Sequence, residues 1–177
     1  TTPTPTPRRT PTPTPRTTQE PTPEPTPAPT VAVTSELVGR WEPVAGSWAG
    51  YSVVIDVPFF GESQVTGRTE GISGSAFIEP RSGETVIASG EFSGDLTQLT
   101  SGDRIVDNQV ARLLQIDTYP TAEFVLTRPV PLPPDDQLRA GAIVPLPGKL
   151  TLLGQARDVL VPATITYSGD RLVIAAS

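Results

Sequence analysis

Apolar and polar residues alternate along most of the chain from Ser47 onward, which is the period expected of β-strands that bury one face. Three such stretches come first: SWAGYSVVIDV from residue 47, QVTGRTEGISGSAFIE from 64 and ETVIASGEFSGDLTQL from 84. One face of each carries, in turn, Tyr51, Val53, Ile55 and Val57; Ile72, Gly74, Ala76 and Ile78; and Val86, Ala88, Gly90, Phe92, Gly94 and Leu96. Long strands with a single apolar face favour a sheet that curls into a barrel.

The stretch LTSGDRIVDNQVARLLQ from residue 99 departs from this period and predicts the one helix of the chain. Ser101 or Asp103 can cap its start, and Asp107 lies where an acid stabilises a helix N-terminus. The side expected to be buried carries Val106, Val110, Leu113 and Leu114. Pro120 prevents the helix from continuing, and a strand then presents Ala122, Phe124 and Leu126 on one face.

The segment RPVPLPPDDQLRAG from residue 128 is rich in proline and predicts a loop without sheet pairing, in which Asp135 and Asp136 are solvated. Three further strands follow: AIVPLPGKLTLLG from 142, ARDVLVPATITYSG from 156 and DRLVIAAS from 170. The pattern lacks the βαβ alternation of a parallel sheet. The residues therefore predict an all-β protein with an antiparallel barrel or sandwich and one short helix.

Composition divides the chain into two parts, because half of its 22 prolines lie in the first 30 residues and alternate mainly with threonine. With almost no apolar side chains, residues 1–34 are expected to form a disordered, extended Thr/Pro-rich linker or stalk; a proline motif read by a partner is the alternative. Residues 35–177 have the size of one domain. Such stalks hold a domain away from a membrane or wall, so we expect an anchor or export signal upstream and an extracytoplasmic location, whether secreted, periplasmic or cell-surface anchored.

The chain has no cysteine and no histidine, which excludes Ser-His-Asp and Cys-His catalysis and the common zinc sites. Residues 1–34 carry three arginines and two glutamates, so the domain holds −7 against a total of −6, which disfavours nucleic acid as a partner. Trp41, Trp48 and Tyr51 are expected to close one end of the barrel, and stacking against a sugar is the alternative. We expect a binding protein rather than an enzyme, with no cofactor and no metal.

Three segments together resemble the YceI-like family: GRTEGISGSAFI, EFSGDLTQLTSGDRIVDNQVARLLQIDTYPTAEFVLT and GKLTLLGQARDVLVPATI. The most specific matches are Asp107, Leu113, Leu114, Asp117, Tyr119, Pro120, Ala122 and Phe124, followed by Gly148, Leu150, Thr151, Leu152 and Gly154. The resemblance implies an exported, extended lipocalin-like antiparallel barrel that binds a polyisoprenoid or related amphiphile inside it. Leu153 stands where the family usually carries histidine, which affects the polar contacts available to a headgroup.

The alternation and the resemblance together predict an apolar cavity. Its expected lining residues are Tyr51, Val53, Ile55, Ile72, Ala76, Phe92, Leu96, Phe124, Leu126 and Leu152. The ligand would be a prenyl lipid or a quinone-like compound. The alternative is a barrel filled by side chains, serving as a structural or adhesive surface module. The family commonly continues beyond residue 176, so the barrel could lack closing strands and pair with another copy through its open edge as a homodimer.

Overall fold

The computed structural model describes residues 36–57 and 61–176, without the side chains of 55–57, 61 and 63. The predicted linker at 1–34 lies outside the described residues. The strands are β1 Gly39–Trp41, β2 Ala49–Val57, β3 Gly61–Thr69, β4 Ile72–Arg81, β5 Glu84–Asp95, β6 Thr121–Leu126, β7 Val130–Pro131, β8 Ala142–Leu152, β9 Gln155–Ser168 and β10 Arg171–Ala176. A 3-10 turn, η1 Leu96–Gln98, and two helices, α1 Arg104–Leu113 and α2 Asp135–Ala140, complete the described elements.

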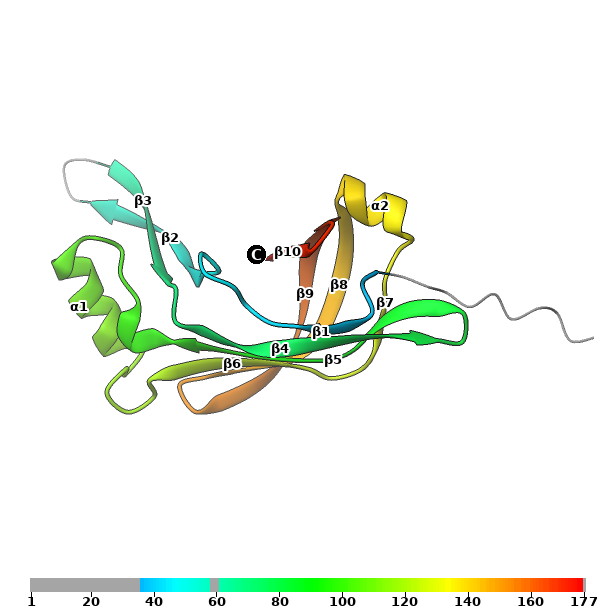
Figure 1. The fold of residues 1–177 in the computed structure, drawn as a ribbon. Helices are drawn as coiled ribbons and strands as arrows, with labels where there is room; N and C mark the ends of the chain where they lie inside the picture. The colour runs from blue at the N-terminus through cyan, green and yellow to red at the C-terminus, as the bar shows by residue number, and fades with distance from the viewer. Residues whose placement is uncertain (1–35, 58–60, 177) are drawn as a thin grey trace, which may run out of the picture. The chain divides into compact units, whose positions relative to one another are not determined.

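The main sheet is antiparallel and has the strand order β1-β4-β5-β6-β8-β9-β10, with β7 pairing β5 beside it. It curls as a half-barrel, in which β8, β9 and β10 turn away from the plane of β4 and β5 (Figure 1). Strands β2 and β3 form a separate two-stranded sheet. The prediction of an all-β, antiparallel, lipocalin-like fold is confirmed.

The stretch from residue 64 to 79 is two strands instead of one, because the chain turns at Glu70 and Gly71. The amide of Ile72 donates to the Glu70 carbonyl at 2.8 Å, and β3 leaves the main sheet at this turn. Just before this turn, Arg68 forms an isolated antiparallel bridge with Thr100, in which the Arg68 amide donates to the Thr100 carbonyl at 2.9 Å and the Thr100 amide donates to the Arg68 carbonyl at 3.0 Å. Backbone pairing therefore attaches the β2–β3 hairpin to the loop before α1.

A β-bulge in β5 corrects the predicted inward face of that strand. Phe77 pairs with Ser89, but the next residue, Ile78, pairs with Ile87, so that Ala88 is the extra residue. As a consequence Ile87, rather than Val86 or Ala88, lies on the same face as Ile78. Gly90, Phe92 and Gly94 lie on the same face of β5, as predicted.

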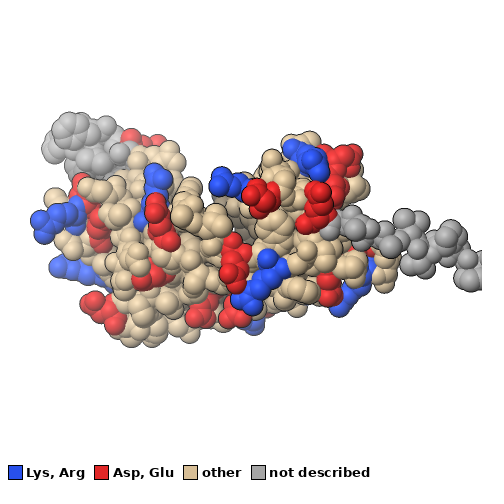
Figure 2. All heavy atoms as spheres, viewed as in Figure 1, with Lys and Arg blue, Asp and Glu red and all other residues tan. Residues whose placement is uncertain are grey.

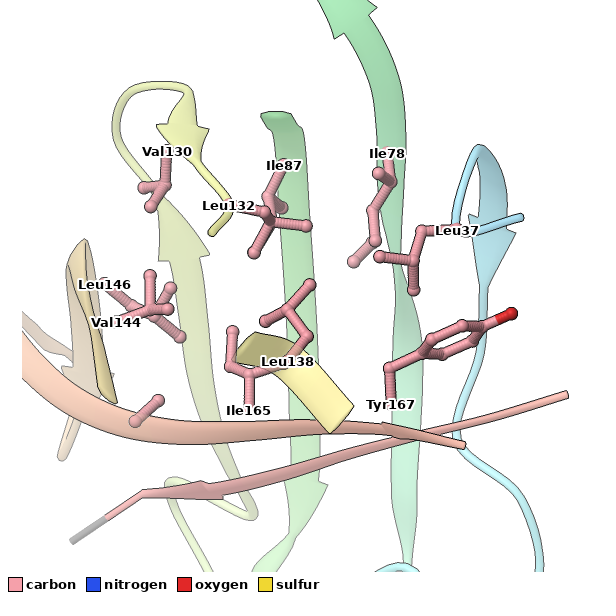
Figure 3. Packing of buried hydrophobic residues seen from close by; sticks show 12 residues of the cluster. Leu37, Ile78, Ile87, Val130, Leu132, Leu138, Val144, Leu146, Ile165 and Tyr167 are labelled. Atoms are coloured by element: carbon pink, nitrogen blue, oxygen red, sulfur yellow. The ribbon is translucent and has the colours of Figure 1, made fainter. Parts of the chain in front are cut away.

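The hydrophobic core fills one side of the main sheet, near β9 and α2. Figure 3 shows Leu138 of α2 lying next to Ile165 of β9, with Leu37 close to Ile78 and Tyr167. Leu37, Leu138 and Ile165 are fully buried. The expected loop from residue 128 is thus wrong in two respects: Val130–Pro131 pairs with β5, and Asp135 and Asp136 begin a helix whose Leu138 completes the core.

Helix α1 confirms the predicted helix and one of the two predicted caps. Asp103 accepts hydrogen bonds from the amides of Ile105 and Val106 at 2.8 and 3.3 Å. The predicted buried side is only partly correct, because Leu113 is 75% exposed while Val106, Val110 and Leu114 are half-buried. No residue of α1 is fully buried, so this helix contributes less to the core than α2 does.

Candidate ligand-binding face

The inner face is defined here as the face of the main sheet whose residues are in register with the buried core. Directly paired residues of antiparallel strands project from the same face. One row of pairs crosses the sheet through Phe92, Phe124, Leu150 and Arg157. Beside it runs a second row, which includes Leu126, Gly148 and Val159.

Part of the inner face is filled by the core, and part is not. Phe92, Phe124 and Leu126 are half-buried and pack against the core cluster. Leu150 is 38% exposed, and on the far edge strand Ile174 is 39% exposed. Figure 2 shows the surface hollowed between the side that carries α1 and the side that carries α2. The inner face therefore leaves the apolar side chains of Leu150 and Ile174 partly uncovered.

Small residues occupy the inner face beside the two phenylalanines. Gly90 and Gly94 belong to β5, and Ala122 lies opposite Gly94 on β6. The Phe124 ring lies over Gly148, so a β-carbon at that position would overlap the ring. Small neighbours leave space above the sheet, part of which Phe124 fills.

The predicted lining residues fall into two groups. Ile72, Ala76, Phe92, Phe124, Leu126 and Leu152 lie on the main sheet, and Leu96 is buried in η1 directly after β5. Tyr51, Val53 and Ile55 lie on β2, which belongs to the other sheet. Val53 is 43% exposed, and the Ile55 side chain is outside the described residues. Their role as lining residues stays a prediction.

The structure separates the three aromatic residues that were expected to close the barrel together. Trp41 packs edge-on against Tyr167, with ring centroids 6.2 Å apart. Trp48 is 56% exposed, and the Arg68 guanidinium lies 5.5 Å from its ring centroid. Tyr51 packs over Gly67 of the neighbouring strand. Within the described ranges no ring contact joins the three residues.

Two surface hollows are polar. One, of about 530 Å³, lies between β1, β4 and β5 and is lined mainly by Arg40, Glu42, Glu91 and serines. The other, of about 460 Å³, lies at the Arg68–Thr100 bridge and is lined by hydroxyl, amide and charged side chains. Of the predicted lining residues only Ile72 borders either one. These hollows are distinct from the uncovered apolar part of the inner face.

The hydroxyl of Tyr51 is buried and has no hydrogen-bond partner of good geometry among the described residues. Burial raises the pKa of Tyr51, and the negative charge of Asp107 raises it further, while the nearby Ser101 lowers it. A phenol held in its neutral form at this place cannot act as a base at neutral pH.

The described residues hold no group of acidic side chains arranged to bind a metal ion. Within the same ranges, no helix is long and apolar enough to cross a membrane.

The two most specific segments of the sequence resemblance meet in space. The Tyr119 ring packs against Gly154 in the turn between β8 and β9, and the Phe124 ring lies over Gly148. A family model for the YceI-like domain matches residues 47–176. The chain belongs to the YceI-like family. The suspected resemblance is therefore confirmed.

Solved structures of other proteins show the same fold. BcnA of Burkholderia cenocepacia is 23% identical, with a TM-score of 0.55 over 73% of this chain and 74% of that one. A polyisoprenoid binding domain from Saccharophagus degradans, implicated in plant cell wall breakdown, is 15% identical, with a TM-score of 0.54 over 77% and 73%. A search among curated proteins gave no match.

Leu150 and Arg157, two residues of the row that begins at Phe92, were not among the predicted lining residues. The apolar alternation of Val159, Val161 and Ala163 continues backwards onto Arg157, which pairs with Leu150. Extending the period by one step from Val159 would have placed this charge on the inner face.

Proposed function

We propose that this YceI-like domain binds a polyisoprenoid, or a similar long apolar amphiphile such as a quinone, on the inner face of its sheet. The observation that carries the proposal is the uncovered apolar surface around Phe92, Phe124 and Leu150. Family membership and the polyisoprenoid binding domain from Saccharophagus degradans support the same ligand class.

The energetics of this face suit a hydrocarbon ligand. Burying a methylene group contributes about 0.8 kcal/mol, so a few isoprene units can bind without a polar motif. Association costs several kcal/mol, which sets a minimum chain length for measurable affinity. A longer isoprenoid should accordingly bind more tightly until the inner face is covered.

The test is lipid loading followed by native mass spectrometry. The full chain purified from membranes, or incubated with isoprenoid alcohols, should retain a lipid of defined mass. Leu150→Asp places a charge on the inner face and should abolish loading. Val125→Asp is the matched control, because Val125 is 40% exposed against 38% for Leu150 and pairs with Lys149 on the opposite face.

Thermal unfolding prevents a folding defect from being mistaken for lost binding. Phe124→Asp should also abolish loading, and thermal unfolding of each variant shows whether the fold persists. Wild-type protein that carries no lipid would refute the proposal and favour the alternative, a structural or adhesive surface module. Equal loading of the Leu150 and Val125 variants would refute the assignment to the inner face.

We further propose that the domain works outside the cytoplasm, tethered to a membrane or wall through residues 1–34. The Thr/Pro-rich composition of that segment supports this location. Cell fractionation of the tagged full-length protein tests it, and recovery in the cytoplasm would contradict it.

A further inference from the structure

Arg157 is the one charged residue on the inner face of the main sheet within the described residues. The position is fixed by register: Arg157 pairs with Leu150, Leu150 with Phe124, and Phe124 with Phe92. Every other position in register with the core is a glycine or another uncharged residue. An exposed cation at the end of an apolar row can pair with the anionic group of an amphiphile.

The protein supplies no acidic partner for Arg157 in the part of the chain that the structure describes. The next residue, Asp158, projects from the opposite face and pairs with Lys149 at 3.5 Å. Glu123, on β6, also lies on that opposite face, because it alternates with Phe124. Arg157 itself is exposed, so an anion can reach its guanidinium from solvent.

The row that leads to Arg157 has the dimensions of a short amphiphile. Neighbouring strands lie about 4.8 Å apart, so the three steps from β5 to β9 span about 14 Å. Phe92, Phe124 and Leu150 make up the apolar length, and the guanidinium is its polar end. A chain lying across the strands would bring its headgroup to Arg157.

We propose that Arg157 binds the phosphate of a phosphorylated isoprenoid whose hydrocarbon lies on the apolar row. A guanidinium donates paired N–H groups in a plane, a geometry that fits a phosphate better than a hydroxyl. The inference rests on the proposed function and names the class of headgroup that the domain prefers.

Another role for an inward charge is to block strand pairing at a sheet edge. Strand β10 pairs with residues 163–168 of β9, so among the described strands none lies on the other side of β9 at Arg157. Loss of the charge would then cause self-association without any change in ligand preference. The experiment below separates the two roles.

The test compares farnesol with farnesyl phosphate, which share one hydrocarbon chain, by calorimetric titration of the full chain. Wild type should bind the phosphate about tenfold more tightly than the alcohol, since the phosphate offers an opposite charge and paired acceptor oxygens to the guanidinium, whereas the hydroxyl accepts a single hydrogen bond. Arg157→Gln should remove this preference by weakening the binding of farnesyl phosphate far more than the binding of farnesol. Arg157→Lys should keep part of the preference, and Arg128→Gln, at an exposed loop arginine, should keep all of it.

The outcomes distinguish this inference from the proposed function. Equal binding of both ligands by wild type overturns the role of Arg157 while lipid binding stands, whereas binding of neither overturns this inference, and lipid loading then tests the proposed function separately. A preference that survives in Arg157→Gln, with or without self-association by light scattering, overturns the headgroup assignment. Inorganic phosphate that binds as tightly as farnesyl phosphate would identify a free anion as the ligand instead.

Discussion

The ring of Tyr119 lies against the backbone of Gly154, where an added β-carbon would come within 2.6 Å of ring atom Cε1. Tyr119 follows α1, and Gly154 is in the turn between β8 and β9. Gly154 also has a positive φ of 68°, a conformation that glycine adopts most readily. This contact joins the connection between α1 and β6 to the distant β8–β9 hairpin.

Gly154→Ala should therefore destabilise the domain through both the ring contact and the backbone. Gly169→Ala is the matched control, because Gly169 has a similar φ of 63° and open space around its α-carbon. The control should cost about 1 kcal/mol, the cost of a non-glycine residue in this region, and Gly154→Ala should cost more. Urea unfolding of both variants measures the difference, and equal losses would contradict a stabilising role for the Tyr119 contact.

The sequence predicted the elements around Tyr119 because their signals are local. The Asp103 cap, the helical spacing of Val106 and Val110, and the break at Pro120 each act within a few residues. The alternation of Ala122, Phe124 and Leu126 then identified β6 and its inward face, which the core confirms for Phe124 and Leu126.

The features that were missed depend on distant residues. The apolar alternation along β5 does not depend on how its residues pair with β4. The bulge at Ala88, which is a change in that pairing, could therefore not be predicted from the alternation. Similarly, the apolar face of β2 predicted a strand correctly but could not show that, among the described strands, β2 pairs with β3 alone. The six-residue helix α2 is too short to be stable alone, and it depends on burial of Leu138.

That dependence gives a prediction about the two helices. Leu138→Ala in α2 should destabilise the domain by about 2 to 5 kcal/mol, because it removes a fully buried side chain and leaves a cavity. Leu113→Ala in α1 should change stability by less than about 0.5 kcal/mol, because that side chain is 75% exposed. Chemical denaturation of both variants tests this contrast, and similar losses would show that Leu113 is covered in solution.

The two buried tyrosine hydroxyls should respond in opposite ways to removal. Tyr51→Phe removes a hydroxyl that is buried without a partner of good geometry, so stability should stay the same or rise. Tyr167→Phe removes a donor to Glu36 Oε2 at 3.2 Å, so stability should fall. Thermal unfolding at neutral pH compares the two variants, and a clear loss in Tyr51→Phe would show that its hydroxyl is paired in solution.

Asp107 links the loop before α1 to the stability of the domain at low pH. Its carboxylate accepts hydrogen bonds from the Ser101 hydroxyl at 2.6 Å, the Ser101 amide at 2.7 Å and the Thr100 hydroxyl at 2.7 Å. These bonds, led by the Ser101 hydroxyl, lower the pKa of Asp107 below its ordinary value of 3.8. The stabilisation is complete above that value and is lost as the pH falls through the lower pKa of the folded state.

Asp107→Asn should accordingly be less stable than wild type at neutral pH. The difference in stability between the two proteins should become smaller as the pH falls below 3.8, the ordinary pKa of an aspartate. Asp95 contributes in the same direction, because hydrogen bonds from Thr97 and Gln98 lower its pKa too. The double variant Asp95→Asn, Asp107→Asn should therefore lose the least stability as the pH falls into the acidic range. Thermal unfolding from neutral to acidic pH measures these curves, and a constant gap between wild type and Asp107→Asn would contradict a lowered pKa for Asp107.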